Sequence, residues 1–270
     1  MLTQPAAVRM RSASPGKNAR HITVYHSAVT QDGRTPLRIV TYNIHRCRGM
    51  DRRTKPERIA RVLRDIGADV IALQEVIGPG PHGHSHIEEI GAAVGMGWVM
   101  ASARQIRGHQ FGNVVLSRLP ITHHVQHDLS WKTCWERCMQ RVDIDLGGRP
   151  LHVYNVHLGT AILERRHQAR RLATIVSDRH VAGPKIVLGD FNEWMRGLTT
   201  TLLSAKLKSV DLRNYLQRRR TYPGLFPFLH LDHIYYAGQL EVVGIELSRT
   251  RLSLVASDHL PLIADVRVGL

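Results

Sequence analysis

The sequence predicts an α/β fold in a single domain, on the basis of three observations. Apolar segments rich in β-branched residues, such as residues 37–44 and 69–75, alternate with a helical pattern that starts at Pro56 and stops at Gly67. Polar residues stand where the apolar segments end. No long Gly/Ser/Pro linker divides the middle of the 270-residue chain, and its 43% hydrophobic content is enough for one sizeable core.

The remaining elements are predicted from the same patterns. The near-continuous apolar run at 69–75 favours a strand buried on both faces, and Gly147-Gly148 is typical of a hairpin turn. Helices are expected at residues 86–94 and 162–180, and short helices after residue 192. Further strands are expected at residues 98–102, 111–117, 121–127, 137–146, 150–157, 185–189 and 231–236, with two more flanking residues 257–261.

Residues 1–36 are predicted to be a flexible basic extension, and residues 37–270 to be the folded domain. The extension is rich in Arg, Ser, Gln and Pro and has no sustained apolar periodicity. It lacks the apolar core of a signal peptide, and no apolar run in the chain is long enough to span a bilayer. We therefore expect a cytoplasmic, monomeric protein without a transmembrane segment.

The chain is strongly basic, with 37 Lys and Arg against 22 acidic residues and a formal net charge of +15. A field of this sign concentrates polyanions, so a nucleic acid is the favoured partner and an anionic phospholipid the alternative. Arginines that are merely solvated on helix surfaces would produce the same total without any ligand. Charge therefore indicates the kind of partner but not the reaction.

The cysteines are Cys47, Cys134 and Cys138. An odd and sparse set argues against a disulfide framework and favours a reducing compartment. Cys134 and Cys138 have no further Cys or His at ligand spacing, so they make a weak zinc signal. We expect buried thiols.

Two surface features allow more than one interpretation. Arg165, Arg166, Arg170 and Arg171 have helical spacings that could form a basic stripe, although a solvated surface is the default. Alternate histidines in the loop 78–86 suggest a metal site. A loop rich in Gly and Pro does not preorganise ligands, which favours the simpler interpretation of a mobile loop.

Polar groups at strand ends are the main functional signal. They are Asn43, Glu75, His157, Asp190 with Asn192, Asp232, and Asp258 with His259. Asp190 and Asn192 are two residues apart, so in a strand they point to the same side. A turn would explain Asp-Phe-Asn by itself, but six such positions in one chain favour a shared site.

The chemistry of this group favours a hard divalent cation. Carboxylates and amides on one rim of a sheet supply the oxygen ligands that Mg²⁺ prefers, and Mn²⁺ is the alternative ion. The histidines lack the spacing of a zinc site. We therefore assign them to substrate binding and proton transfer.

An ordered set of motifs resembles the endonuclease/exonuclease/phosphatase superfamily, which includes DNase I, exonuclease III, neutral sphingomyelinases and inositol polyphosphate 5-phosphatases. The motifs are TYNIH at 41–45, LQEV at 73–76, FGNV at 111–114, NVHL at 155–158, GDFN at 189–192, LDHI at 231–234 and SDH at 257–259. The resemblance covers about residues 37–270. It implies a DNase I-like, four-layer αββα sandwich of two mixed β-sheets, with the site at one end.

The resemblance also implies a role for each site residue. Glu75 would be the principal metal carboxylate, with Asn43 and Asp258 close to the cation or its waters. Asp190 would orient and deprotonate the attacking water, and Asn192 would hold a phosphate oxygen. His157 and His259 would face the scissile phosphate. Asp232 would hydrogen-bond His259 and fix its tautomer. The residues that would contact substrate are Asn113, Asn155 and Arg141.

The implied function is a Mg²⁺-dependent phosphodiester hydrolase acting on nucleic acid. Histidine at position 157 disfavours abasic-site repair, because the exonuclease III branch carries tyrosine there. The alternatives are a sphingomyelinase-like phospholipid phosphodiesterase, a phosphatase for a small phosphorylated substrate, and a non-catalytic binding protein on a nuclease fold. We find no amphipathic helix suited to a bilayer, although Trp131, Trp135 and residues 226–228 could form a small apolar lip.

Overall fold

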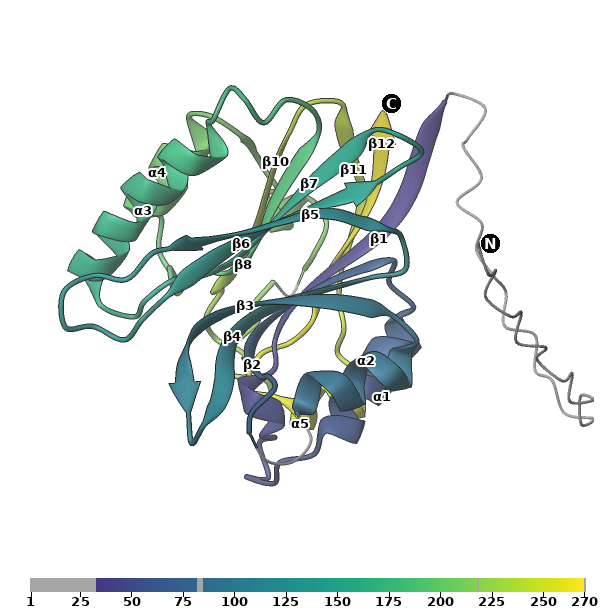
Figure 1. Ribbon diagram of the computed structural model, residues 1–270, viewed down its shortest axis with the longest axis vertical. Helices are drawn as coiled ribbons and strands as arrows, with labels where there is room; N and C mark the ends of the chain where they lie inside the picture. The colour runs from purple at the N-terminus through teal and green to yellow at the C-terminus, as the bar shows by residue number, and fades with distance from the viewer. Residues whose placement is uncertain (1–32, 82–84, 218, 270) are drawn as a thin grey trace, which may run out of the picture.

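The chain forms a four-layer αββα sandwich, as Figure 1 shows. This computed structural model describes residues 33–81, 85–217 and 219–269. Two six-stranded mixed sheets pack face to face, and helices cover their outer surfaces. The fold predicted from the sequence is confirmed, whereas the predicted extension lies almost entirely outside the described residues.

The first sheet has the strand order β11-β12-β1-β2-β4-β3. Its central strands β1 and β2 are parallel, and the other pairs are antiparallel. The bounds are β1 (Arg34–Asn43), β2 (Val70–Ile77), β3 (Gly97–Ile106), β4 (His109–Ser117), β11 (Leu240–Leu247) and β12 (Leu262–Gly269).

The second sheet has the strand order β5-β6-β7-β8-β10-β9. Here β7 and β8 are the parallel central pair, so each sheet has one parallel pair next to its centre. The bounds are β5 (Ile121–Asp128), β6 (Cys138–Asp145), β7 (Pro150–His157), β8 (Lys185–Asp190), β9 (Lys208–Ser209) and β10 (Asp232–Ala237).

The helices divide between the two outer faces. α1 (Pro56–Ile66), α2 (His86–Val94) and α5 (Arg251–Ala256) pack on the first sheet, whereas α3 (Ile162–Val176) and α4 (Leu198–Ser204) pack on the second. Two short 3₁₀ turns, η1 (His45–Cys47) and η2 (Leu212–Asn214), complete the list. In the described part of the chain no helix is long and apolar enough to cross a membrane.

The main core lies between the sheets and consists of the inward-facing residues of both. Ile39 and Leu262 of the first sheet pack against Val153 and Leu188 of the second, and all four are fully buried. Because alternate residues of a strand face opposite sides, the other residues of the same strands pack under the helices. This two-sided burial explains why the central strands are almost continuously apolar.

Element boundaries differ from the predictions at a few points. β1 starts at Arg34 rather than residue 37, because residues 34–36 pair with the end of β12. α3 ends at Val176 rather than near residue 180, where Asp178 accepts a hydrogen bond from the His180 backbone N–H and starts a turn. Of the predicted buried thiols, Cys47 and Cys138 are buried, and Cys134 is only partly buried in the loop before β6.

Three polar side chains join the two sheets inside the core. The Asn155 Nδ2 group donates to the carbonyls of Leu73 and Val114, both at 2.9 Å, and the Asn155 Oδ1 atom accepts from Gln74 at 2.8 Å. The Asn113 amide donates to the Cys138 carbonyl across the same interface at 3.0 Å. These buried contacts correct the prediction that Asn113 and Asn155 bind substrate, because their side chains hold the sheets together.

Replacing Asn155 with Ala should therefore reduce stability without removing any group from the site. The carbonyls of Leu73 and Val114 would lose a buried donor, at about 1–3 kcal/mol per group, whereas the Gln74 amide keeps Thr41 and Ala72 as acceptors. We expect the free energy of unfolding in urea to fall by at least about 2 kcal/mol. Asn214→Ala, at an exposed position of η2, is the control, and an equal effect of both variants would contradict the assignment.

Two histidines pack together at the start of β10. The ring centroids of His230 and His233 are 4.3 Å apart, and the His233 Nε2 atom lies 2.9 Å from the Glu193 carbonyl. The His230 Nε2 atom is buried and has no hydrogen-bond partner among the described residues. Burial, together with the neighbouring His233, lowers the pKa of His230 to about 3.

This shift predicts loss of stability in acid. The unfolded chain takes up a proton on His230 below about pH 6.5, whereas the folded chain resists it down to about pH 3. Above about pH 6.5 His230 is neutral in both states and does not lower the free energy of unfolding. As the pH falls below that value, the free energy of unfolding decreases by about 1.4 kcal/mol per pH unit. His230→Asn should flatten the pH dependence of urea unfolding between about pH 6.5 and pH 4.5, whereas His180→Asn, at an almost fully exposed site, should leave the slope unchanged.

Candidate active site

The site forms where the central strands of both sheets end. Asn43 is the last residue of β1, His157 of β7 and Asp190 of β8, and β7 and β8 pair so that His157 lies next to Asp190. Asp232, the first residue of β10, pairs with Asp190 from the other side. The topology therefore brings together residues that are far apart in the sequence.

Glu75 reaches the site from an irregular point within β2. The β2–β4 register shifts between Leu73 and Val76, and Glu75 has a φ of +56°. Left-handed backbone is unfavourable for a residue with a side chain, and a bulge of this kind redirects one side chain of a strand. The Glu75 carboxylate is consequently half-buried beside Asn43, whose Nδ2 group donates to Glu75 Oε1 at 3.3 Å.

Three nitrogen atoms converge on one oxygen of Asp190. The Asn43 Nδ2 atom lies 3.0 Å from Asp190 Oδ2, His259 Nε2 lies at 3.5 Å, and His157 Nε2 lies at 3.6 Å. The other oxygen, Oδ1, accepts from the backbone N–H of Asn192 at 2.9 Å. Burial raises the pKa of Asp190 to about 6, although the positive charge of His259 opposes the increase.

His259 is held between two carboxylates. The predicted hydrogen bond to Asp232 is present, with His259 Nδ1 3.0 Å from Asp232 Oδ2, and the opposite ring nitrogen faces Asp190. Burial by itself lowers the pKa of His259, but the Asp232 and Asp190 carboxylates outweigh it and raise the pKa to about 10. His259 is therefore an imidazolium at neutral pH.

His157 has the opposite protonation state. Burial lowers its pKa well below the ordinary value, and the nearby Arg137 guanidinium and the charged His259 act in the same direction. The Arg137 Nη1 atom lies within 3.0 Å of both ring nitrogens of His157. The site thus contains one charged and one neutral imidazole on the same side of Asp190.

Glu75, Asn43 and Asp258 are the candidates for holding a cation. Asp258 accepts from the Ser257 hydroxyl at 3.3 Å, and its other oxygen lies 3.4 Å from His45 Nδ1. Among the described residues, no three His, Cys, Asp or Glu side chains cluster closely enough to cage a metal on their own. Mg²⁺ is typically bound through one or two carboxylates together with water and substrate phosphate, so this donor set fits an ion of that kind.

Two other predicted site residues have contacts that narrow their roles. The Asn192 Nδ2 group donates to the Leu158 carbonyl at 2.9 Å, which leaves its second N–H for a ligand. Arg141 lies on the same face of β6 as Met139 and Asp143, and this face packs under α3. The Arg141 Nε atom is 3.2 Å from Asp143 Oδ1. Arg141 therefore supports the outer face of the second sheet, and the prediction that it binds substrate is corrected.

Several residues near the reacting groups were not predicted from the sequence. Arg137 is one of 37 Lys and Arg in the chain, and no pattern separates it from the rest. The Tyr222 ring lies 5.0 Å from the His259 ring, and it belongs to a loop with no recognisable motif. His45 and Ser257 lie inside motifs that the sequence analysis identified, so the motifs were the signal that could have assigned them a role.

Arg165 departs from the expected solvated stripe. Its guanidinium is buried and donates to the carbonyls of Gly159 and Thr160, in the segment that follows His157. Arg166, Arg170 and Arg171 are exposed, as a solvated surface requires. Of the loop 78–86, residues 82–84 lie outside the described residues, so the histidine-rich interpretation stays a prediction.

Comparison with known proteins identifies the family. A model of the endonuclease/exonuclease/phosphatase family matches residues 40–259. The chain is 32% identical over 247 residues to the uncharacterized protein YbhP of Escherichia coli strain K12, an alignment that covers 86% of this chain and 96% of that protein.

Solved structures share the fold at lower identity. An endonuclease/exonuclease/phosphatase from Beutenbergia cavernae superposes with a TM-score of 0.69 at 22% identity, over 87% of this chain and 72% of that one. The mannosyl-6-phosphatase Bt3783 of Bacteroides thetaiotaomicron superposes with a TM-score of 0.70 at 16% identity, over 85% of this chain and 99% of that one. With a family model that spans most of the sequence and a relative matched over nearly its whole length, the chain belongs to the endonuclease/exonuclease/phosphatase family.

Proposed function

We propose that this protein is a Mg²⁺-dependent phosphodiester hydrolase, with Mn²⁺ as an alternative ion. Family membership supports the broader class of phosphoester hydrolases. The observation that carries the proposal is the convergence of Asn43, His157 and His259 on Asp190 Oδ2, next to the half-buried Glu75 carboxylate. Burial makes such a carboxylate a stronger base by raising its pKa, and the surrounding donors stabilise its ionised form before it takes a proton.

Asp190 would act on the attacking water. Burial raises its pKa to about 6, so it is a stronger base than an ordinary aspartate and is still mostly ionised at neutral pH. The hydrogen bond from the Asn192 backbone to Oδ1 fixes the carboxylate and leaves Oδ2 for proton transfer. General acid or base catalysis of this kind contributes on the order of 10²- to 10⁴-fold.

The other residues would stabilise negative charge on the phosphoryl group. His259 carries a positive charge that Asp232 orients through Nδ1, while the neutral His157 and the free N–H of Asn192 supply hydrogen bonds. Glu75, with Asn43 and Asp258, would hold the divalent cation. When bound, such a cation neutralises charge that develops on the phosphoryl oxygens.

The reacting groups fit more than one phosphorylated substrate. The net charge of +15 supports a polyanion, either a nucleic acid or an anionic phospholipid. The similarity to a mannosyl-6-phosphatase keeps a small phosphorylated molecule as a second candidate. A non-catalytic binding role is disfavoured because every predicted reacting position carries a side chain that can perform its role, and the fold brings these side chains together.

The free cysteines support the proposed cytoplasmic location.

Replacing Asp190 with Asn tests the reaction directly. The variant keeps the size of the side chain but cannot accept the proton, so turnover of bis(p-nitrophenyl) phosphate with Mg²⁺ should fall by at least about 100-fold. Asp178→Asn changes a surface carboxylate that pairs with His180 and should leave turnover unchanged. Near-normal activity of a correctly folded Asp190→Asn protein would show that this aspartate is not the base.

Removal of the divalent cation tests the other half of the proposal. EDTA should abolish hydrolysis, and added Mg²⁺ or Mn²⁺ should restore it, because the protein alone leaves the phosphoryl charge partly unneutralised. Glu75→Gln should raise the Mg²⁺ concentration needed for half-maximal activity by at least about 10-fold, since one of few carboxylate ligands is lost. Full activity in EDTA would contradict the metal-dependent mechanism.

A further inference from the structure

Large apolar side chains are exposed around the mouth of the site. Seven of them have exposed fractions between 47% and 76% and lie on loops or at the start of α3, a few residues along the chain from site residues; they are Trp135, Ile162, Leu163, Trp194, Met195, Phe226 and Phe228. We call this set the apolar rim. Soluble proteins rarely gather exposed apolar side chains in one area unless that area binds something.

One part of the rim is attached to His157 through arginines. Trp135 lies two residues before Arg137, whose Nη1 atom contacts the His157 ring. The Arg104 guanidinium stacks 4.1 Å above the Trp135 ring, and its positive charge contributes to the lowered pKa of His157. Trp135 therefore stands at the edge of the site and not on a remote surface.

A second part follows the strands that deliver His157 and Asp190. Ile162 begins α3 five residues after His157, and Trp194 and Met195 follow Asn192 after one intervening residue, Glu193. The Arg165 guanidinium lies 5.3 Å from the Trp194 ring centroid, and Ile162, Trp194 and Met195 line one cavity. These three apolar side chains thus share one cavity with the charged residues Arg165, Arg166, Glu193 and Arg196.

The third part belongs to the loop that covers His259. Tyr222 of this loop packs on the His259 ring, and the Gly224 N–H donates to the Asp258 carbonyl at 2.7 Å. Phe226 and Phe228 lie on the same loop and are exposed. All three parts of the rim are therefore connected to the reacting groups by direct contacts or by a few residues of chain.

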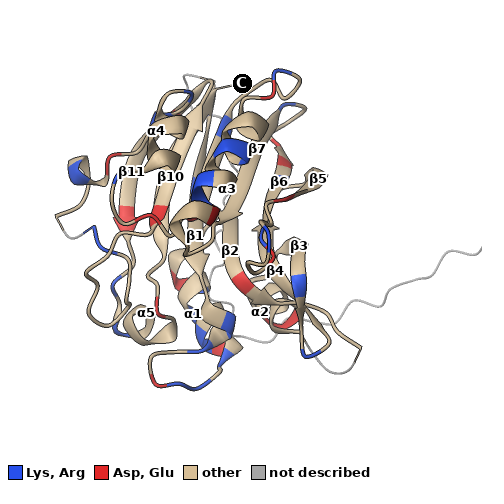
Figure 2. Cartoon of the chain, turned by 90° about the vertical axis from the view of Figure 1, so that its left-hand side faces the viewer, with Lys and Arg blue, Asp and Glu red and all other residues tan. Residues whose placement is uncertain are grey.

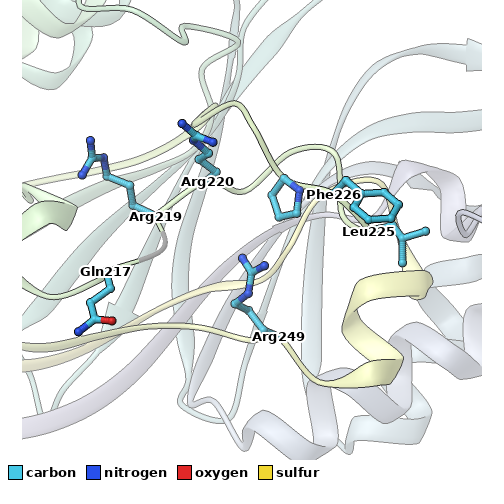
Figure 3. A pocket seen from close by; sticks show the side chains of 7 residues that line it. Gln217, Arg219, Arg220, Leu225, Phe226 and Arg249 are labelled. Carbon is cyan, nitrogen blue, oxygen red and sulfur yellow. The ribbon is translucent and has the colours of Figure 1, made fainter.

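The same loop and the segment between β11 and α5 form a basic pocket, shown in Figure 3. The pocket has a volume of about 600 Å³, and the guanidinium groups of Arg219, Arg220 and Arg249 surround it together with Leu225 and Phe226. In the part of the chain that the structure describes, none of these arginines has a carboxylate within ion-pair distance. The pocket combines uncompensated positive charge with an apolar wall.

We propose that the mouth of the site docks on an anionic phospholipid bilayer. The apolar rim would enter the interface, and the pocket of Arg219, Arg220 and Arg249 would bind lipid headgroup phosphate. This inference rests on the proposed hydrolase function and names its substrate class as a phospholipid phosphodiester presented by a membrane.

The composition of the rim favours lipid over single-stranded nucleic acid. Aromatic rings and arginines serve both partners, because bases stack on rings and tryptophans concentrate at membrane interfaces. Ile162 and Met195 offer no ring for a base, yet they are as exposed as the aromatic residues. Aliphatic side chains gain from entering a hydrocarbon environment, so their exposure is explained by a bilayer. Figure 2 shows further basic segments on α3, on α1 and on several loops.

Vesicle co-sedimentation of the full chain tests the proposal. The wild type should bind vesicles of phosphatidylglycerol and phosphatidylcholine at least 10-fold more tightly than vesicles of phosphatidylcholine alone. Phe226→Ser with Phe228→Ser should weaken binding at least about 10-fold. Arg219→Ala with Arg249→Ala should weaken it about 25-fold, at about fivefold per arginine.

Matched variants and a soluble substrate separate the possible outcomes. Val243→Ser removes an exposed apolar residue of β11 outside the rim, and Arg61→Ala removes an exposed arginine of α1; both should bind vesicles as the wild type does. Hydrolysis of bis(p-nitrophenyl) phosphate should be unchanged in the Phe226 and Phe228 variant. If the wild type does not hydrolyse bis(p-nitrophenyl) phosphate, the proposed hydrolase function is refuted. The docking proposal is then decided by the vesicle measurement alone.

Three results would overturn the docking proposal. The first is that the wild type does not bind phosphatidylglycerol vesicles, and the second is that the rim variants bind them as tightly as the wild type. The third is that the rim is needed to bind a single-stranded oligonucleotide but not to bind vesicles. The last result would assign the rim to nucleic acid.

Discussion

Burial of the Asp190 carboxylate is the constraint on which the site depends. A buried ionised carboxylate is costly unless donors surround it, and here they come from different parts of the fold. Asn43 belongs to the first sheet, His157 to the second, and His259 to the loop before β12. Because each sheet contributes, the carboxylate is stabilised only when the sheets pack in one register. The same packing that forms the core therefore also sets the protonation of the site.

The neighbours of the two site histidines give them different states. Both rings are buried, and burial disfavours the charged form of each. Carboxylates on both ring nitrogens overcome this effect for His259, whereas Arg137 reinforces it for His157. One imidazole can then supply positive charge while the other supplies a neutral N–H. His157 and His259 have the same side chain, so their different protonation states come only from the elements that surround each ring.

The candidate reacting groups and the residues proposed for docking occupy separate parts of the fold. The reacting groups sit on strand ends, where the sheets hold them in place. The apolar rim and the arginine pocket lie at the start of α3 and on loops outside these strands, including the loop that carries Tyr222 over His259. Loops tolerate sequence change more readily than the strands that they connect. A common reaction centre can in this way serve different phosphorylated partners.

The sequence by itself determined the fold and most of the candidate site. Apolar strands ending in Asn43, His157 and Asp190 could be recognised because strand periodicity and strand ends are local properties. The prediction that Asn155 and Arg141 bind substrate is wrong. Only the packed structure shows that the Asn155 amide bridges the two sheets and that the Arg141 side chain faces α3. Arg137 and Tyr222 carry no local signal, and the tertiary structure alone places them beside the histidines. Protonation states likewise belong to the tertiary structure, because burial and neighbouring charges arise from contacts between segments that are distant in the chain.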